Sequence, residues 1–279
     1  MQEGPPICSD FEVRGRPYIG TSTLDALSSH IAANAALVRP GFVVLDPFCG
    51  TGSLLLSSAF LGADVVGADI DADCLGLVDL TNSTYKSRSK NARFKRRNKV
   101  NGLEWNQLNG SIIMNFEYYG LERKVLSLIA CSVEAWSQLP STGTPTVNEF
   151  PLFDAIVTDP PFGRRERVFS SEQVNAELIS SELSGFHNDS KYAIVMLFIV
   201  AMKRLKHGGK LVFWLPTEAF LTRQEVELML ETYKSSAISI SNAYADPGVG
   251  KKLIFENAKQ QELNYGVWRW LVRYRSVCS

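Results

Sequence analysis

The sequence predicts an α/β fold: a mostly parallel, seven-stranded sheet with an antiparallel last strand and helices on both faces. Two observations lead to this prediction. Short apolar runs rich in β-branched residues alternate five times with helical segments, which is typical of parallel strands joined by helices. The 279 residues are 45% hydrophobic and 21% charged. These values are close to the averages of globular proteins, so disorder or a coiled coil over the whole chain is excluded.

The expected strands are short apolar runs of the kind that is buried on both faces of a sheet. They lie at 42–45, 64–68, 125–130, 153–158 and 210–215, and a final antiparallel ribbon is expected from 237–243 and 267–274. Helices are expected at 23–38, 52–61, 72–85, 191–206 and 224–233. Glycine or proline follows several of these segments, as is common where helices end.

The range 16–279 is expected to form one domain, and residues 1–15 a flexible extension or linker, because they contain Gly, Pro and Ser and have no periodicity. Residues 86–117 are interpreted as an insertion that begins with a basic run, KSRSKNARFKRRNK. Such a run attracts phosphates. The candidate RNA contacts in it are Arg93, Lys95, Arg96 and Arg97. A solvated loop is the equally good alternative.

The composition excludes several classes of protein. Lys and Arg together number 29, as do Asp and Glu, so a uniformly basic coat for nucleic acid is excluded, although a local basic patch is not. The five cysteines form no C-x-x-C pair, and the three histidines lack ligand spacing, so we expect neither a disulfide framework nor a metal site. No apolar run reaches the ~20 residues that a membrane span needs. A cytoplasmic protein without membrane contact is therefore expected.

The loop after the first strand, Asp46 to Ser53, carries Gly50 and Gly52 directly before a helix. Glycines let the backbone approach a ligand closely, and a helix N-terminus offers unpaired N–H groups. The dinucleotide fingerprint would need a third glycine where Leu55 stands, which disfavours a nicotinamide dehydrogenase. An ordinary strand-to-helix turn remains the alternative.

Two further loops carry carboxylates. Asp69 ends the second strand, where a carboxylate can accept hydrogen bonds from ribose hydroxyls, while Asp71 suits a helix cap. Asp159-Pro160-Pro161-Phe162 follows the fourth strand. The two prolines stiffen this turn, so that a carboxylate and an aromatic ring are held a fixed distance apart. The pair could bind an exocyclic amine and stack on its planar base, in line with a methyl donor.

Taken together, segments 46–52, 69–71 and 159–162 resemble the donor-binding and catalytic motifs of class I S-adenosylmethionine-dependent amino methyltransferases, which have a Rossmann-like fold. Segments 18–25, 119–122 and 158–166 are similar to the eukaryotic and archaeal tRNA (guanine-10-N2) methyltransferases. The similarity covers roughly residues 16–275, nearly the whole chain.

The resemblance implies a role for each matching residue. Asp159, Pro160, Pro161 and Phe162 would be catalytic, with Asp159 on the guanine amine and Phe162 stacked on the base, although this subfamily mostly has Tyr there. Ser132 or Glu134 would replace the Asp that usually contacts the adenine. Apart from the resemblance, Arg164 and Arg165 follow the catalytic turn and could touch substrate phosphate, with simple surface charge as the equally good alternative. The implied donor-binding residues are Thr21, Ser22, Asp46, Phe48, Gly50, Gly52, Asp69, Ile70, Ser132 and Val133.

The implied reaction transfers a methyl group from S-adenosylmethionine to the N2 amine of a guanine in tRNA, at guanine-10, and leaves S-adenosylhomocysteine without using a metal. The implied partners are tRNA and a small zinc-binding activator subunit that pairs with a sheet edge. Relatives also carry an N-terminal RNA-binding region with a THUMP domain, so the chain is expected to be a catalytic fragment. The alternatives are a DNA adenine-N6 or rRNA amino methyltransferase, and a non-catalytic platform that binds the donor.

Overall fold

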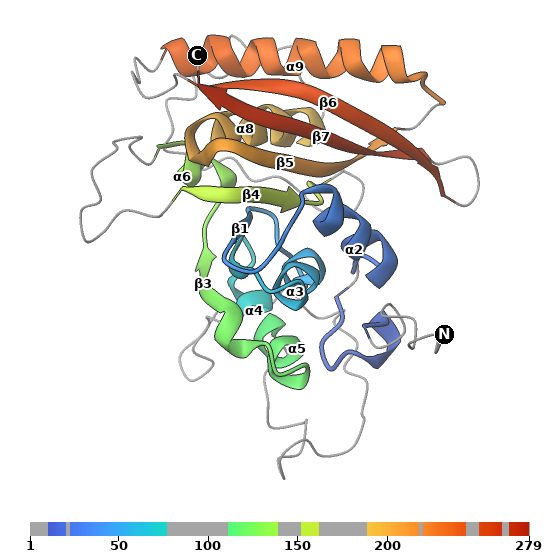
Figure 1. Ribbon diagram of the computed structural model, residues 1–279, viewed down its shortest axis with the longest axis vertical. Coiled ribbons are helices and arrows are strands. Elements are labelled where there is room, and N and C mark those ends of the chain that lie inside the picture. Colours follow the sequence, from blue (N-terminus) through green and yellow to red (C-terminus); the bar gives the residue numbers. More distant parts are fainter. Residues whose placement is uncertain are drawn as a thin grey trace. The chain divides into compact units, whose positions relative to one another are not determined.

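The computed structural model describes residues 11–20, 23–76, 111–138, 152–161, 189–217, 220–243, 251–263 and 268–278. They fall into two compact units, Met1–Cys131 and Ser132–Ser279. Each unit combines strands with helices (Figure 1). Among the described helices, none is both long and apolar enough to cross a membrane.

The first unit is built on three parallel strands in the order β3-β2-β1. Their bounds are β1 (Val43–Asp46), β2 (Asp64–Asp69) and β3 (Val125–Ala130). The middle residues of β1 and β2 are buried and only strand ends are half-buried, as expected for strands covered on both faces. Strand β3 is the outer strand of this unit and exposes Leu126.

The helices of this unit are η1 (Val13–Gly15), α2 (Ala26–Ala35), α3 (Ser53–Phe60), α4 (Ala72–Leu75), α5 (Ile112–Tyr118) and η3 (Glu122–Lys124). Asp25 caps α2, because its carboxylate accepts a hydrogen bond from the Ser28 N–H at 2.8 Å. Helix α3 packs closely on β2 at Gly67, where a Cβ atom would lie 2.6 Å from Leu55 Cδ1. The absent side chain at Gly67 therefore sets how near α3 lies to the sheet.

The second unit contains a mixed sheet in the order β4-β5-β7-β6 (Figure 1). The strands are β4 (Phe153–Thr158), β5 (Leu205–Thr217), β6 (Lys251–Glu262) and β7 (Trp268–Cys278). Strands β4 and β5 are parallel, and β7 is antiparallel to both β5 and β6. The helices are α6 (Val133–Gln138), α8 (Asp189–Arg204) and α9 (Arg223–Ala243). Phe198 of α8 packs edge-on against Phe213 and Tyr274, which fixes this helix on the sheet.

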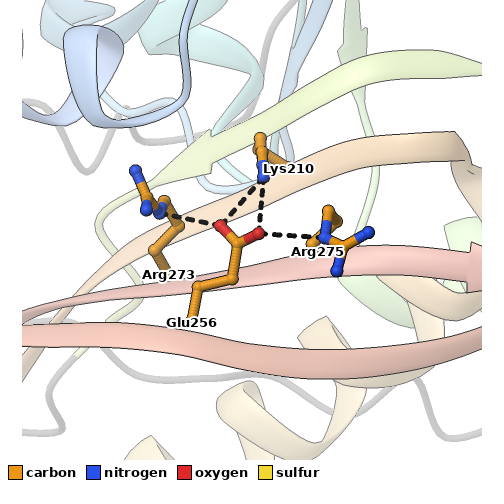
Figure 2. A network of polar contacts seen from close by, with 4 residues as sticks. All are labelled: Lys210, Glu256, Arg273 and Arg275. Carbon is orange, nitrogen blue, oxygen red and sulfur yellow. Dashed lines mark hydrogen bonds and ion pairs between the residues drawn. The ribbon is translucent and has the colours of Figure 1, made fainter.

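A charged network lies on the sheet of the second unit, around Glu256 of β6 (Figure 2). A bulge between Phe255 and Asn257 interrupts the ladder there. The Glu256 carboxylate contacts Lys210 Nζ at 2.7 Å, Arg273 Nε at 2.9 Å and Arg275 Nε at 3.0 Å. Burial alone would raise the pKa of Glu256, but the hydrogen bond and charge of Lys210 and the two arginines outweigh it and leave that pKa below its ordinary value. One carboxylate thus joins β5, β6 and β7.

The predicted fold class is confirmed: the described chain holds seven strands, and the last, β7, runs against its neighbours. The ribbon prediction is wrong in its first strand, because residues 237–243 belong to α9 and the strand that forms the ribbon with β7 is β6. Strand β5 also starts earlier than predicted, directly after α8. Of the helix expected at 72–85, the described part is α4, and residues 77–85 lie outside the described chain.

Candidate active site

The turn after β1 is closed by backbone contacts. The Asp46 carboxylate is buried, and its Oδ1 accepts a hydrogen bond from the Phe48 N–H at 3.1 Å. The Cys49 N–H donates to the Ala68 carbonyl of β2 at 2.9 Å. Gly50 and Gly52 have φ values of 48° and 78°, in the left-handed region that favours glycine. These two φ values explain why glycine stands at both positions of the turn.

Asp69 joins this turn to the end of β2. Its Oδ2 accepts a hydrogen bond from the Gly50 N–H at 2.8 Å, and its Oδ1 accepts one from the Asp71 N–H at 2.9 Å. Carboxylate oxygens are strong hydrogen-bond acceptors, and ribose hydroxyls are donors that suit a carboxylate at the end of a second parallel strand. Ile70 follows with 48% of its surface exposed and offers an apolar contact beside the carboxylate. A ligand with a ribose diol and a flat base fits this pair, because the diol can donate to the carboxylate and the base can lie against the apolar side chain.

Cys49 lies inside the same turn. Burial raises the pKa of its thiol well above the ordinary value, and the charges of Asp69 and Asp46 raise it further. The thiol is therefore neutral near pH 7 and is not a nucleophile. Its sulfur fills space beside Gly67, where a Cβ atom would lie 3.1 Å from Sγ.

Two residues that the sequence did not single out hold the glycine turn from outside. Arg16 has only 1% of its surface exposed, donates from Nη1 to Ser53 Oγ at 2.5 Å, and donates from Nε and Nη2 to the Phe11 carbonyl at 3.2 and 3.0 Å. Desolvation lowers the pKa of Arg16, and Tyr119 opposes that change. Since Ser53 is the first residue of α3, Arg16 ties the N-terminal segment to the start of this helix.

Asn115 of α5 is the second of these residues. Its side-chain amide pairs with both backbone groups of Tyr18, accepting from the N–H and donating to the carbonyl, each at 3.0 Å. It also lies 3.5 Å from the Thr51 carbonyl in the glycine turn. Helix α5 contacts the turn directly as well, because a Cβ atom on Gly52 would overlap the Ile112 side chain. No local sequence signal marks these contacts, since the residues are far apart in the chain.

In the second unit, Asp159, Pro160 and Pro161 follow the carboxyl end of β4. Strand β4 is anchored by Ala155, Ile156 and Val157, which are fully buried. Asp159 is half-buried, and Pro160 is buried. Thr158, which precedes Asp159, pairs with Phe213 of β5. The turn thus starts from a rigid position in the sheet.

Ser132 and Val133 come at the start of α6. Ser132 is half-buried, and its carbonyl accepts a hydrogen bond from the Ala135 N–H at 3.2 Å, while Val133 and Glu134 are buried. The remaining predicted site residues lie outside the described residues. They are Thr21, Ser22, Arg93, Lys95, Arg96, Arg97, Phe162, Arg164 and Arg165. Within the described residues, no group of three His, Cys, Asp or Glu side chains could hold a metal ion.

Comparison with known proteins shows which family this chain matches. Residues 14–207 match the family model described as UPF0020, RMKL-like, methyltransferase domain. The chain is 33% identical over 219 residues to tRNA (guanine(10)-N(2))-methyltransferase TRMT11 of Xenopus laevis, which covers 75% of this chain and 40% of that protein. It is 29% identical over 222 residues to the protein of the same name from Homo sapiens, covering 75% and 42%.

A third relative of that name, from Dictyostelium discoideum, is 32% identical over 218 residues, covering 74% of this chain and 35% of that protein. The chain therefore spans about two fifths of the length of the curated relatives that it matches. Among solved structures, TrmN from Thermus thermophilus superposes with a TM-score of 0.50 at 17% identity, covering 91% of this chain and 50% of that one. That likeness supports the fold.

Proposed function

Because the chain belongs to the RMKL-like methyltransferase domain family, we propose that it transfers a methyl group from S-adenosylmethionine to the exocyclic N2 amine of a guanine in tRNA. The observation that carries the proposal is the hydrogen bond between Gly50 and Asp69, which presents a carboxylate beside a glycine turn in a chain of this family. The names of the TRMT11 relatives supply the substrate class, and guanine-10 is the proposed position.

The proposed donor site uses the loops after β1 and β2. Asp69 would accept hydrogen bonds from the ribose hydroxyls, and Ile70 would lie against the adenine. Gly50 and Gly52 would face the methionine part, in a turn that Asp46 shapes by accepting the Phe48 N–H at its carboxylate. Thr21 and Ser22 are proposed to hold the methionine carboxylate, and Ser132 and Val133 to contact the adenine.

The proposed catalytic turn is Asp159-Pro160-Pro161-Phe162. The donor supplies an electrophilic methyl group on a sulfonium ion and leaves as S-adenosylhomocysteine. Asp159 would accept a hydrogen bond from the guanine amine, which orients the nitrogen lone pair, and its carboxylate would take the proton that the amine loses when the new N–C bond forms. Phe162 would stack on the base, while the two prolines keep the carboxylate and ring in register. Most of the rate gain would come from proximity and orientation.

The proposal also names contacts for the substrate and a place for a partner. Arg93, Lys95, Arg96 and Arg97 are proposed to bind tRNA phosphates, with Arg164 and Arg165 close to the target nucleotide. Strand β3 is the outer strand of the first unit and exposes Leu126, and an outer strand can accept a strand from another protein. We assign that position to the small zinc-binding activator, and the cytoplasm as the place of action.

The proposal is tested by offering labelled S-adenosylmethionine and separate pools of unmodified tRNA, rRNA and duplex DNA, with and without a zinc-binding activator. We expect label in the tRNA pool alone, and loss of at least 100-fold in rate for Asp159→Ala, since this residue aligns the reacting amine. If label appears only in DNA or only in rRNA, tRNA is the wrong substrate class. Equal background turnover in wild type and Asp159→Ala, with donor binding intact, would make the chain a donor-binding platform.

A further inference from the structure

An aromatic side chain stands exposed at the end of β5. Phe220 has 62% of its surface exposed. Its ring meets that of Trp268, the first residue of β7, with centroids 5.3 Å apart and an interplanar angle of 81°. In such an edge-to-face contact Trp268 covers at most one face of the Phe220 ring. Phe220 therefore presents aromatic surface to its surroundings.

The chain around Phe220 is held in place on its C-terminal side. The Leu221 carbonyl lies 3.4 Å from Gln260 Nε2 of β6. Thr222 and Glu225 form a reciprocal cap at the start of α9: the Thr222 N–H donates to Glu225 Oε2 at 2.7 Å, and the Glu225 N–H donates to Thr222 Oγ1 at 3.3 Å. The ring is thus presented from an anchored segment, which lowers the entropy cost of binding a ligand on it.

The position of Phe220 relates it to the proposed catalytic turn within the same unit. Thr158, which precedes Asp159, pairs with Phe213, while Thr217 at the end of β5 pairs with Trp268. The four steps from Phe213 to Thr217 advance by about 13 Å along the strand. Since β4 and β5 are parallel, Asp159 and Phe220 follow the carboxyl ends of neighbouring strands, the end at which such sheets bind ligands.

We propose that Phe220, backed edge-on by Trp268, is a stacking platform for an unpaired base of the RNA substrate, adjacent to the guanine that is methylated. The inference rests on the proposed function. A phenylalanine ring can stack on any base, so the platform would hold the strand without reading its sequence. Arg223, exposed three residues later at the start of α9, adds a positive charge suited to the RNA backbone.

The test measures binding of an unpaired oligoribonucleotide that contains guanine, together with versions that lack one neighbouring base at a time. Phe220→Ala should weaken binding by about 5-fold to 100-fold, the range for one base stacked on one aromatic ring. Phe220→Tyr should keep the affinity, and Phe220→Leu, which keeps apolar volume without a ring, should lose it. Leu228→Ala is the matched control, because Leu228 is an apolar side chain 71% exposed on α9.

At one neighbouring position, removal of the base and removal of the Phe220 ring should be coupled. With an RNA that lacks this base, Phe220→Ala should weaken binding no further. The proposed platform is wrong if Phe220→Leu binds RNA as tightly as wild type does. It is also wrong if Phe220→Ala lowers the affinity by the same factor for every RNA that lacks one base. Equal thermal unfolding midpoints of Phe220→Leu and Phe220→Tyr check that the ring, and not the fold, is being measured. The binding assay needs no methyl donor. If RNA binding depends on Phe220 but no methylation is found, only the proposed function is rejected. If the RNA is methylated but binding does not depend on Phe220, only the platform is rejected.

Discussion

Gly50 donates its backbone N–H to Asp69 Oδ2 at 2.8 Å, so the glycine turn after β1 and the carboxylate that ends β2 form one unit. The second oxygen of Asp69 is held by the Asp71 N–H at 2.9 Å. The carboxylate is consequently oriented before any ligand arrives, which reduces the ordering cost of binding.

The first prediction concerns this carboxylate. Asp69→Asn should weaken S-adenosylmethionine binding by about tenfold to a hundredfold, because hydrogen bonds to a charged group contribute about 1.5–3 kcal/mol. Titration calorimetry measures the change. Asp64→Asn is the control, since Asp64 starts the same strand and pairs with Lys124 at 3.2 Å. Equal affinity of wild type and Asp69→Asn would remove Asp69 from the donor site.

The second prediction separates crowding from backbone strain in the glycine turn. Gly52→Ala should destabilise the protein by about 2–4 kcal/mol, because φ is 78° and the new methyl group would overlap Ile112. Gly41→Ala, at φ 85° and with open space around it, should cost about 1 kcal/mol. Urea unfolding compares the two variants. Equal losses would show that α5 does not restrict Gly52.

The third prediction concerns Arg16. Arg16→Ala should lower the free energy of unfolding by about 3 kcal/mol, because it leaves the Phe11 carbonyl and the Ser53 hydroxyl without their donor. Ser53→Ala removes one of these bonds and should cost about 1 kcal/mol. Arg14→Ala, at an exposed arginine two residues earlier, should stay within about 0.5 kcal/mol of wild type. A loss for Arg16→Ala no larger than that of Arg14→Ala contradicts the role of Arg16.

The fourth prediction concerns pH and the network around Glu256. The lowered pKa of Glu256 means that its contribution to stability is complete above its unfolded pKa of about 4.3 and is lost as the pH falls through the folded pKa. Glu256→Gln should therefore destabilise by about 1–3 kcal/mol at pH 7, and the gap to wild type should shrink below about pH 4. Urea unfolding at both pH values tests this, with exposed Glu262→Gln as control. A gap that is constant with pH would show that the carboxylate charge does not stabilise the network.

The fifth prediction concerns cysteine reactivity. Because burial, Asp69 and Asp46 raise the pKa of the Cys49 thiol, Cys49 should resist alkylation at pH 8, whereas the exposed Cys278 should react. The folded state favours the neutral thiol of Cys49, so the contribution of this thiol to the free energy of unfolding is complete below its unfolded pKa. That contribution is lost as the pH rises above it. Peptide mass spectrometry after timed alkylation reads both sites. Labelling of Cys49 as fast as Cys278 would contradict the buried turn.

The sequence predicted the central strands well because strands buried on both faces must be continuous apolar runs. Residues 237–243, Ala-Ile-Ser-Ile-Ser-Asn-Ala, alternate apolar and polar like a half-buried strand, yet they end α9. Ala237 and Ile240 continue the helical spacing of Val226, Leu230 and Tyr233, and all five are buried, while Ile238 is exposed. Strand β6 was missed because it is an outer strand with few buried side chains, and its bulge breaks the period of two.

The same contrast applies to the site. Asp46 and Asp69 could be placed from the sequence because they end β1 and β2, and Gly50 and Gly52 because they follow β1 in the same short loop. Arg16 and Asn115 could not, since their partners Ser53 and Tyr18 lie 37 and 97 residues away in the chain. Contacts of that range depend on how the chain packs, which one sequence does not reveal.

We propose above that this chain methylates the N2 amine of a guanine. The most direct measurement is mass spectrometry of nucleosides from tRNA that has been incubated with the chain, a zinc-binding activator and labelled S-adenosylmethionine, with Asp159→Ala in parallel. We expect labelled N2-methylguanosine with wild type and none with Asp159→Ala. Labelled N6-methyladenosine, or any other labelled nucleoside in place of N2-methylguanosine, would contradict it.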